Sequence, residues 1–173
     1  MKLFPYIKLF AACSLILIVF NFATCKYSTR DTSIKPDVKT FRVNYFENKA
    51  RYNNPQLTPL LTEKLKQRIM GQTRLRQVNT DDAHYDISGY LSDYSVTTSG
   101  IANQNASTDR LNVTFHVVFK NTLDQKKDFE ADLTSNYDFS AQLTLQDAEP
   151  RLLNDIVKNV VDQIFTKIFS SDW

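Results

Sequence analysis

Leu111-Asn112-Val113-Thr114-Phe115-His116-Val117-Val118-Phe119 is the most regular stretch of the chain, with apolar side chains at every second position. Successive side chains of a strand point to opposite faces, so this alternation predicts a β-strand with one apolar face. The stretch is longer than the usual strand of about 5–6 residues. It therefore predicts a sheet built from long, twisted strands.

Strand-like segments lie on both sides of this stretch. Residues 127–139 alternate again after a turn at 121–125, which predicts an antiparallel hairpin. Residues 85–97 show two overlapping apolar phases, with Ile87 and Leu91 in one and Tyr90 and Tyr94 in the other. This overlap indicates either that both faces are partly buried or that a bulge lies near Gly89. The three segments together predict an antiparallel meander.

The segment before the meander predicts one more strand and a helix. Residues 40–46 alternate, with Phe41, Val43 and Tyr45 on the apolar face. A helix is expected from Thr58 as N-cap, through Pro59 in its first turn, to Gly71 just past its end. Its buried stripe consists of apolar residues spaced four apart: Leu61, Leu65 and Ile69.

A second, longer helix is predicted from about Gln146 to Phe169. Apolar pairs recur every four residues from Leu152-Leu153 to Ile168-Phe169, so a wide stripe must be covered along the whole helix. Thr144 is the candidate cap, with Asp147 three residues on. Because Pro150 fits poorly inside a helix, we expect the first turn to begin nearer Asp147.

The element order is β-α-β-β-β-α. The simplest architecture for this order is α+β, with two helices packed on one face of a four-stranded, mostly antiparallel sheet. The expected division is a signal peptide at residues 1–24, a lipidated tether at 25–37 and one domain at 38–173.

The N-terminal segment has the pattern of a bacterial lipoprotein signal. Lys2 and Lys8 precede an apolar run of 12 residues, Leu9 to Phe20. A membrane-spanning helix needs roughly 20 residues, so the run has the size of a signal-peptide core. Phe22-Ala23-Thr24-Cys25 is an imperfect lipobox, and it predicts cleavage before Cys25 and acylation of its thiol. The alternatives are an uncleaved signal anchor or a conventional cut near Ala23.

Removal of the signal changes what the composition implies. Cys13 is lost with it, so the mature chain has one cysteine and no internal disulfide. Without Lys2 and Lys8 the mature chain has 19 basic and 19 acidic residues. The overall pI of about 8.5 therefore gives no indication of nucleic-acid binding.

Recognisable catalytic and metal motifs are absent from the sequence. It contains no nucleophile elbow, no P-loop and no dinucleotide fingerprint. His84 and His116 have no metal-ligand partners at the usual spacings, so we interpret both as ordinary strand residues. The acidic residues of the last strand, among them Asp128, Glu130 and Asp132, are interpreted as a solvated strand face. The sequence thus predicts a non-enzymatic protein without a metal or a cofactor other than the covalent lipid at Cys25.

Basic residues provide the remaining functional indication. One group lies on and just after the first helix, within 13 residues that include no acidic residue: Lys64, Lys66, Arg68, Arg74 and Arg76. A second group flanks the last hairpin and opens the long strand: Arg110, Lys120, Lys126 and Lys127. Such groups can bind phosphates or an acidic partner.

Short segments spread over the mature chain resemble one known family. They include Tyr27-Ser28, Ile34-Lys35-Pro36-Asp37-Val38-Lys39-Thr40-Phe41-Arg42-Val43, Phe46-Glu47-Asn48, Leu60 to Lys66, Gln72 to Leu75, Arg110 to Val113, Lys126 to Glu130, Asp138-Phe139, Asp162 to Phe165, Phe169 and Trp173. In their order and spacing they resemble the short form of the LptE family of lipopolysaccharide-assembly lipoproteins. The glycine expected shortly after Tyr27 is missing.

This resemblance implies a fold, a location and partners. Family members are acylated proteins on the periplasmic side of the outer membrane of Gram-negative bacteria, with a two-helix, four-strand α+β fold. They plug the lumen of the LptD β-barrel, assist its assembly and help to deliver lipopolysaccharide, which basic residues of the family contact. Arg110, Lys120, Lys126 and Lys127 are the candidate contacts here.

Two other functions remain open at this point. A periplasm-facing lipoprotein without a barrel partner would bind a small ligand in an apolar pocket between sheet and helices. A lipid-anchored hydrolase would pair Ser88 or Ser95 with His84, although no triad motif supports it.

Overall fold

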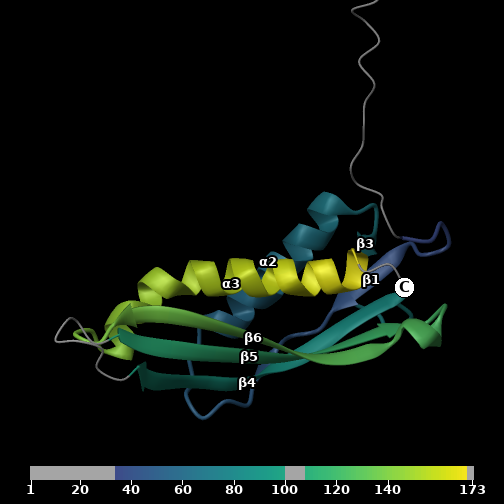
Figure 1. Ribbon diagram of the computed structural model, residues 1–173. Helices are drawn as coiled ribbons and strands as arrows, with labels where there is room; N and C mark the ends of the chain where they lie inside the picture. Colours follow the sequence, from purple (N-terminus) through teal and green to yellow (C-terminus); the bar gives the residue numbers. More distant parts are fainter. Residues whose placement is uncertain (1–33, 100–107, 171–173) are drawn as a thin grey trace, which may run out of the picture.

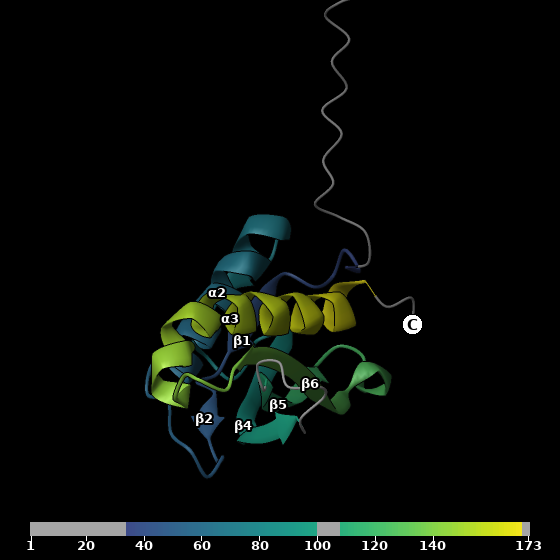
Figure 2. The same ribbon diagram turned by 60° about the vertical axis from the view of Figure 1, so that its left-hand side comes forward.

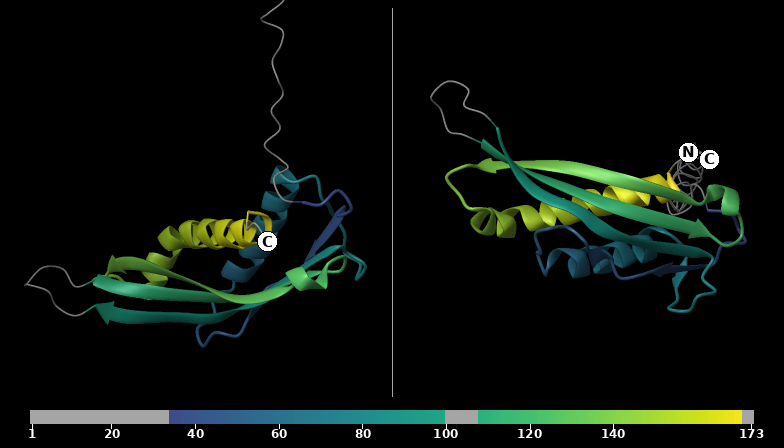
Figure 3. Two further views of the ribbon diagram at one scale, coloured as in Figure 1. Left: turned by 45° about the vertical axis from the view of Figure 1, so that its right-hand side comes forward. Right: turned by 90° about the horizontal axis from the view of Figure 1, so that it is seen from below.

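The computed structural model describes residues 34–99 and 108–170, and Cys25 lies outside this part of the chain. The elements follow in the order β1 (Thr40–Val43), β2 (Glu47–Asn48), α2 (Leu57–Gln72), β3 (Arg76–Gln77), β4 (Tyr85–Ser99), β5 (Thr108–Asn121), the short 3₁₀ helix η1 (Gln125–Lys127), β6 (Phe129–Ser140) and α3 (Leu145–Phe169). They form two layers, with the helices on one face of a curved sheet (Figures 1 and 3).

The described sheet is mixed and six-stranded, in the order β3-β1-β4-β5-β6, with β2 also pairing with β4. β4, β5 and β6 form the antiparallel meander expected from the sequence. β1 and β2 instead run parallel to β4, and β3 runs parallel to β1. The predicted α+β class and the placement of the helices are confirmed, whereas the predicted four-stranded sheet lacked β2 and β3.

The predicted first strand is broken after Val43. Val43 pairs with Ile87 but Glu47 pairs with Tyr90, so one extra residue lies between the two pairings. The slip reverses the side-chain phase: Phe46 is fully buried and Tyr45 is 59% exposed. The prediction that Tyr45 shares the buried face of this strand is therefore wrong.

The irregularity of β4 lies beyond the predicted position. The register against β5 shifts between Leu91 and Asp93, not at Gly89. This bulge explains the two apolar phases, because Leu91 is buried before it and Tyr94 after it. Gly89 has a different role: a Cβ there would lie 2.3 Å from the His116 carbonyl oxygen and 2.7 Å from the Phe46 ring.

The ends of helix α2 differ from the prediction. Gln56 is the N-cap position and provides no side-chain bond, while Thr58 is buried inside the first turn. Gly71 lies within the helix, and Thr73 ends it by donating its hydroxyl to the Ile69 carbonyl over 2.8 Å. The predicted buried stripe of Leu61, Leu65 and Ile69 is confirmed.

Helix α3 begins where its predicted cap requires. The Thr144 hydroxyl accepts the Asp147 N–H over 3.3 Å. The helix then runs through Pro150, contrary to the later start expected from that proline. Proline removes one helical hydrogen bond and bends the axis, and the first turns of α3 are set at an angle to the rest in Figure 2.

The hydrophobic core fills the space between the layers. α3 packs on β5, β6 and α2, and α2 also covers β1 and β3. The largest fully buried side chains come from both layers and include Phe41, Phe46, Phe115, Leu61, Leu65 and Ile156. Phe46 and Phe115 meet edge to face, with ring centroids 6.1 Å apart.

Candidate functional site: the polar face of the sheet

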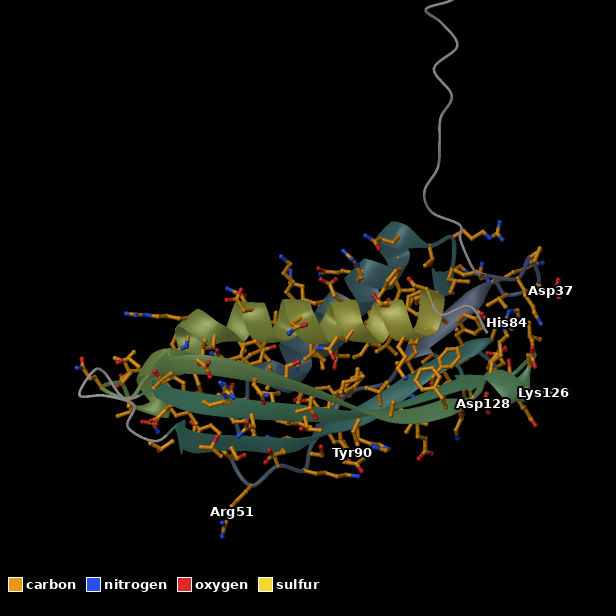
Figure 4. The ribbon with its side chains drawn as sticks, in the orientation of Figure 1. Asp37, Arg51, His84, Tyr90, Lys126 and Asp128 are labelled. Carbon is orange, nitrogen blue, oxygen red and sulfur yellow. The ribbon has the colours of Figure 1, made fainter. Side chains whose placement is uncertain are left out.

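The sheet face opposite the helices is mostly polar, with Val118 of β5 as an apolar exception. Alternate residues of β5 from Leu111 to Phe119 are buried under the helices, so the residues between them point to the other side. We call that side the polar sheet face; its members used below are Arg42, Asp86, Tyr90, Arg110, Thr114, His116, Glu130, Asp132, Thr134 and Asp138. Figure 4 shows Tyr90 on this face, away from α3.

An arginine held by two aspartates marks the end of this face near β1. The Arg42 guanidinium donates to both carboxylate oxygens of Asp86, over 3.1 and 2.8 Å, and also pairs with Asp81. Asn44 adds a further bond to Asp86 over 2.7 Å. The hydrogen bonds to Asp86, and next those to Asp81, raise the pKa of Arg42 above its usual value. Arg42 is therefore a fixed, fully charged part of the face.

Aromatic and ionic contacts occupy the middle of the face. The rings of Tyr90 and His116 stack with centroids 4.9 Å apart. The ammonium of Lys49, which directly follows β2, lies over the Tyr90 ring, 3.9 Å from its centre. His116 Nδ1 lies 2.8 Å from Asp132, and Nε2 lies 3.7 Å from Glu130. The Glu130 and Asp132 side chains are 68% and 66% exposed, so for these two residues the interpretation as a solvated strand face is confirmed, and the imidazole of the neighbouring strand is an additional contact.

The far end of the face is held by another bidentate pair. Arg110 donates to the two oxygens of Asp138 over 2.7 and 3.1 Å. This hydrogen-bonded pair lowers the pKa of Asp138 and raises that of Arg110. Between this pair and His116, the hydroxyls of Thr114 and Thr134 lie 3.0 Å apart. Much of the polar sheet face thus satisfies its charges internally.

The four candidate basic residues do not form one site. Arg110 lies near the start of β5, and Lys120 near its end. They are ten positions apart, which spans roughly 33 Å of strand. Lys126 and Lys127 lie in η1, which contacts β5 at the Lys120 end. The structure therefore brings Lys120, Lys126 and Lys127 to one end of the sheet and leaves Arg110 at the other.

The described chain begins at the lysine-bearing end. Lys35 donates to Asp124, just before η1, over 2.9 Å, and this bond lowers the pKa of Asp124. The Lys39 N–H donates to His84 Nδ1 over 2.9 Å. Figure 4 shows Asp37, His84, Lys126 and Asp128 gathered at this end. Lys35, at the start of the described chain, is therefore fastened beside η1.

The contacts of the histidines and serines favour structural roles. His84 Nδ1 accepts a backbone N–H, and the Ser95 hydroxyl donates to Asp93 over 2.9 Å. Within residues 34–99 and 108–170, no hydrogen bond links Ser88 or Ser95 to His84, and no cluster has the ligands to hold a metal. None of the described helices is long and apolar enough to cross a membrane.

A carboxylate held by two tyrosines fastens the start of α3 to β4. Glu149 accepts the hydroxyls of Tyr94 over 3.0 Å and Tyr52 over 3.4 Å, and the two rings stack 5.5 Å apart. Burial, with the nearby Glu149 charge, raises the pKa of both tyrosines. Sequence periodicity did not reveal this cluster, because its members come from three separate segments.

Comparison with known proteins identifies one matching family model. The model described as LptE, lipopolysaccharide-assembly, matches residues 38–168. No curated protein matches the sequence.

Several solved structures match the chain, among them two that are described as lipoproteins. A minor lipoprotein from Acinetobacter baumannii is 16% identical, with a TM-score of 0.48 over 76% of this chain and 90% of that chain. Rare lipoprotein B from Shewanella oneidensis is 11% identical, with a TM-score of 0.45 over 73% and 92%. A Helicobacter pylori protein described as a homologue of neuraminyllactose-binding hemagglutinin is 7% identical, with a TM-score of 0.51 over 80% and 87%. The last of these shows a shared fold.

Proposed function

The chain belongs to the LptE family of lipopolysaccharide-assembly proteins, and from this premise we propose that it is the lipid-anchored plug and assembly partner of an LptD-type β-barrel in the outer membrane. In this role it assists assembly of the barrel and delivery of lipopolysaccharide. It faces the periplasm, performs no covalent chemistry and needs no cofactor beyond the lipid on Cys25.

The polar sheet face is the observation that supports a plug role. Barrel interiors are polar, so a domain that fills one must present hydrogen-bonding groups over a broad surface. The pairs Arg42–Asp86 and Arg110–Asp138 lie at opposite ends of the face, and their charges are already compensated. Buried against a polar wall, these two pairs would leave no unpaired charge of their own in the interface.

The N-terminal segment is consistent with attachment to a nearby membrane. Cys25 and Ile34 are nine positions apart, which spans at most about 32 Å of extended chain. Because Lys35 is fastened to Asp124, this short segment determines how far the η1 end can lie from the lipid. We propose that Lys120, Lys126 and Lys127 contact anionic groups at that end, and that Arg110 does so at the other.

Purification of the full chain from outer membranes tests the partner. We expect a large barrel protein to copurify in mild detergent, and the complex to be lost when Asp86→Arg and Asp138→Arg place uncompensated cations on the polar sheet face. Lys66→Glu and Arg74→Glu change as many charges away from this face and should keep the complex. A chain recovered alone would contradict the barrel partnership and favour a lipoprotein that acts by itself.

Labelling with palmitate tests the anchor. The full chain should incorporate labelled palmitate, and Cys25→Ala should abolish incorporation. Continued labelling of the Cys25→Ala chain would show that the lipid is attached elsewhere.

A further inference from the structure

A groove with a volume of about 340 Å³ lies between α2 and α3. These helices cover the sheet face opposite the polar sheet face (Figure 1). Its floor is apolar and consists of Leu60, Val157 and Val161. Val157 and Val161 are 3% and 5% exposed. The volume lies at the lower end of the range of small-molecule sites, about 300–1,000 Å³.

The rim of this groove is cationic. Lys64 from α2 and Lys158 from α3 line it from opposite helices, and both are exposed. No ion pair within the described residues engages either lysine, although Lys64 lies 3.5 Å from the Gln67 amide oxygen. The groove therefore carries two uncompensated positive charges beside an apolar floor.

A fixed guanidinium closes one end. Arg68 pairs with Asp162 across the groove over 3.0 Å and lies 5.3 Å from the centre of the Phe165 ring. Its Nε is buried and has no hydrogen-bond partner among the described residues. The Arg68 side chain as a whole is 39% exposed, so an oxygen anion seated in the groove can approach the guanidinium.

We propose that the groove between α2 and α3 binds a single alkyl chain with an anionic head group, the chain lying on Leu60, Val157 and Val161 and the anion between Lys64, Lys158 and Arg68. The lining residues of α2 advance by eight positions, about 12 Å of helix, which suits an extended chain. An anion without a chain would leave the floor empty, and a neutral chain would leave both lysines without a partner.

This inference does not rest on the barrel partnership. It concerns the helix face, whereas the plug role rests on the polar sheet face. An anionic glycolipid and a free fatty acid share the required chemistry, so the site is defined here by an alkyl chain plus an anion.

Photolabelling of the full chain in phosphatidylcholine nanodiscs tests the site. The probe is dodecyl phosphate with a diazirine on the alkyl chain, and bound sites are mapped by mass spectrometry of the peptides. We expect saturable labelling of peptides from 60–68 and 154–162. The same chain on a phosphocholine head should label them roughly tenfold less, and inorganic phosphate should not compete.

Matched variants separate the groove from general basicity. Lys64→Gln with Lys158→Gln should reduce labelling roughly tenfold. Lys126→Gln with Lys127→Gln removes the same charge elsewhere and should leave labelling unchanged. Lys64→Arg with Lys158→Arg should retain it, which excludes loss of folding as the cause.

Several outcomes would overturn the proposal. In the first, the two pairs of Lys→Gln substitutions reduce labelling equally. In the second, the labelled peptides lie outside the groove. In the third, inorganic phosphate alone competes with the probe. A photoreactive benzoylphenylalanine at position 158 that crosslinks a second copy or another protein would show that a polypeptide occupies the groove. Copurification of the barrel is a separate measurement, so each proposal can fail without the other.

Discussion

The two outer surfaces of this two-layer domain carry their charges differently. On the polar sheet face, Arg42 and Arg110 are each paired with an aspartate of an adjacent strand. In the groove between the helices, Lys64 and Lys158 have no acidic partner among the described residues. A surface that compensates its own charge suits a broad polar contact, whereas uncompensated cations beside an apolar floor select a charged amphiphile.

The two surfaces also differ in the elements that support them. The polar sheet face rests on three long hydrogen-bonded strands, and its side chains hold one another across the register. The groove lies where two helices meet through side chains alone. We therefore expect substitutions on the sheet to change stability and substitutions in the groove to change binding.

Gly89→Ala should have the largest effect on stability. Its new Cβ would meet the His116 carbonyl at 2.3 Å, and this backbone atom cannot move without shifting β5. We expect a loss of about 3 kcal/mol in the free energy of unfolding, measured by urea denaturation. Gly71 is the matched control, because nothing lies within 4 Å of its Cβ position, so Gly71→Ala should stabilise by about 0.5–1 kcal/mol. Equal effects at the two glycines would disprove the close approach of β4 and β5.

Asp86→Asn should have the next largest effect. The change removes the charge that Arg42 and Asn44 both contact, and the Arg42 and Asp86 side chains are only 18% and 21% exposed. We expect a loss of about 1–2 kcal/mol in the free energy of unfolding. Asp138→Asn breaks the corresponding pair with Arg110 at an exposed position, where solvent screens the interaction, so its loss should be smaller. If Asp138→Asn lowered the free energy of unfolding more than Asp86→Asn, the Arg42–Asp86 pair would not be the more stabilising of the two.

The loss of stability at acidic pH should depend on Asp124 and Asp138. Bonds to Lys35 and Arg110 lower the pKa of these carboxyls in the folded chain. Their stabilising contribution is therefore complete above the unfolded pKa of about 3.9 and is lost as the pH falls through the lower folded values. Asp124→Asn with Asp138→Asn should make the decline in urea midpoint below about pH 4 shallower. An unchanged decline would show that other carboxyls control acid unfolding.

Much of the fold, but little of the site, could be predicted from the sequence. The meander and both helix stripes follow from periodicity, because each element has one face against the core. Tyr45 and Phe46 do not follow this periodicity, because one extra residue between the pairings of β1 and β2 with β4 buries Phe46 and exposes Tyr45. β3 has two residues, too few to show any period.

The functional surfaces depend on pairings that sequence patterns do not contain. Lys64 stood out in a basic group on α2, but its counterpart Lys158 comes from α3, whose pattern indicated only a wide apolar stripe. Arg110 and Lys120 looked like one group because both flank a strand. The length of β5 separates them, and only the register shows that Arg110 is paired with Asp138.

The smallest effect on stability should come from the groove itself, and this prediction tests the comparison most directly. Both lysines are exposed and lack an acidic partner in the described chain, so Lys64→Gln with Lys158→Gln should change the free energy of unfolding by no more than about 0.5 kcal/mol. The same variant should lose most of its labelling by the alkyl phosphate, whereas Asp86→Asn should lose stability and keep its labelling. If the lysine pair instead destabilised the domain as much as Asp86→Asn, its charges would serve the fold. The distinction between a self-compensated sheet face and a binding groove would then be wrong.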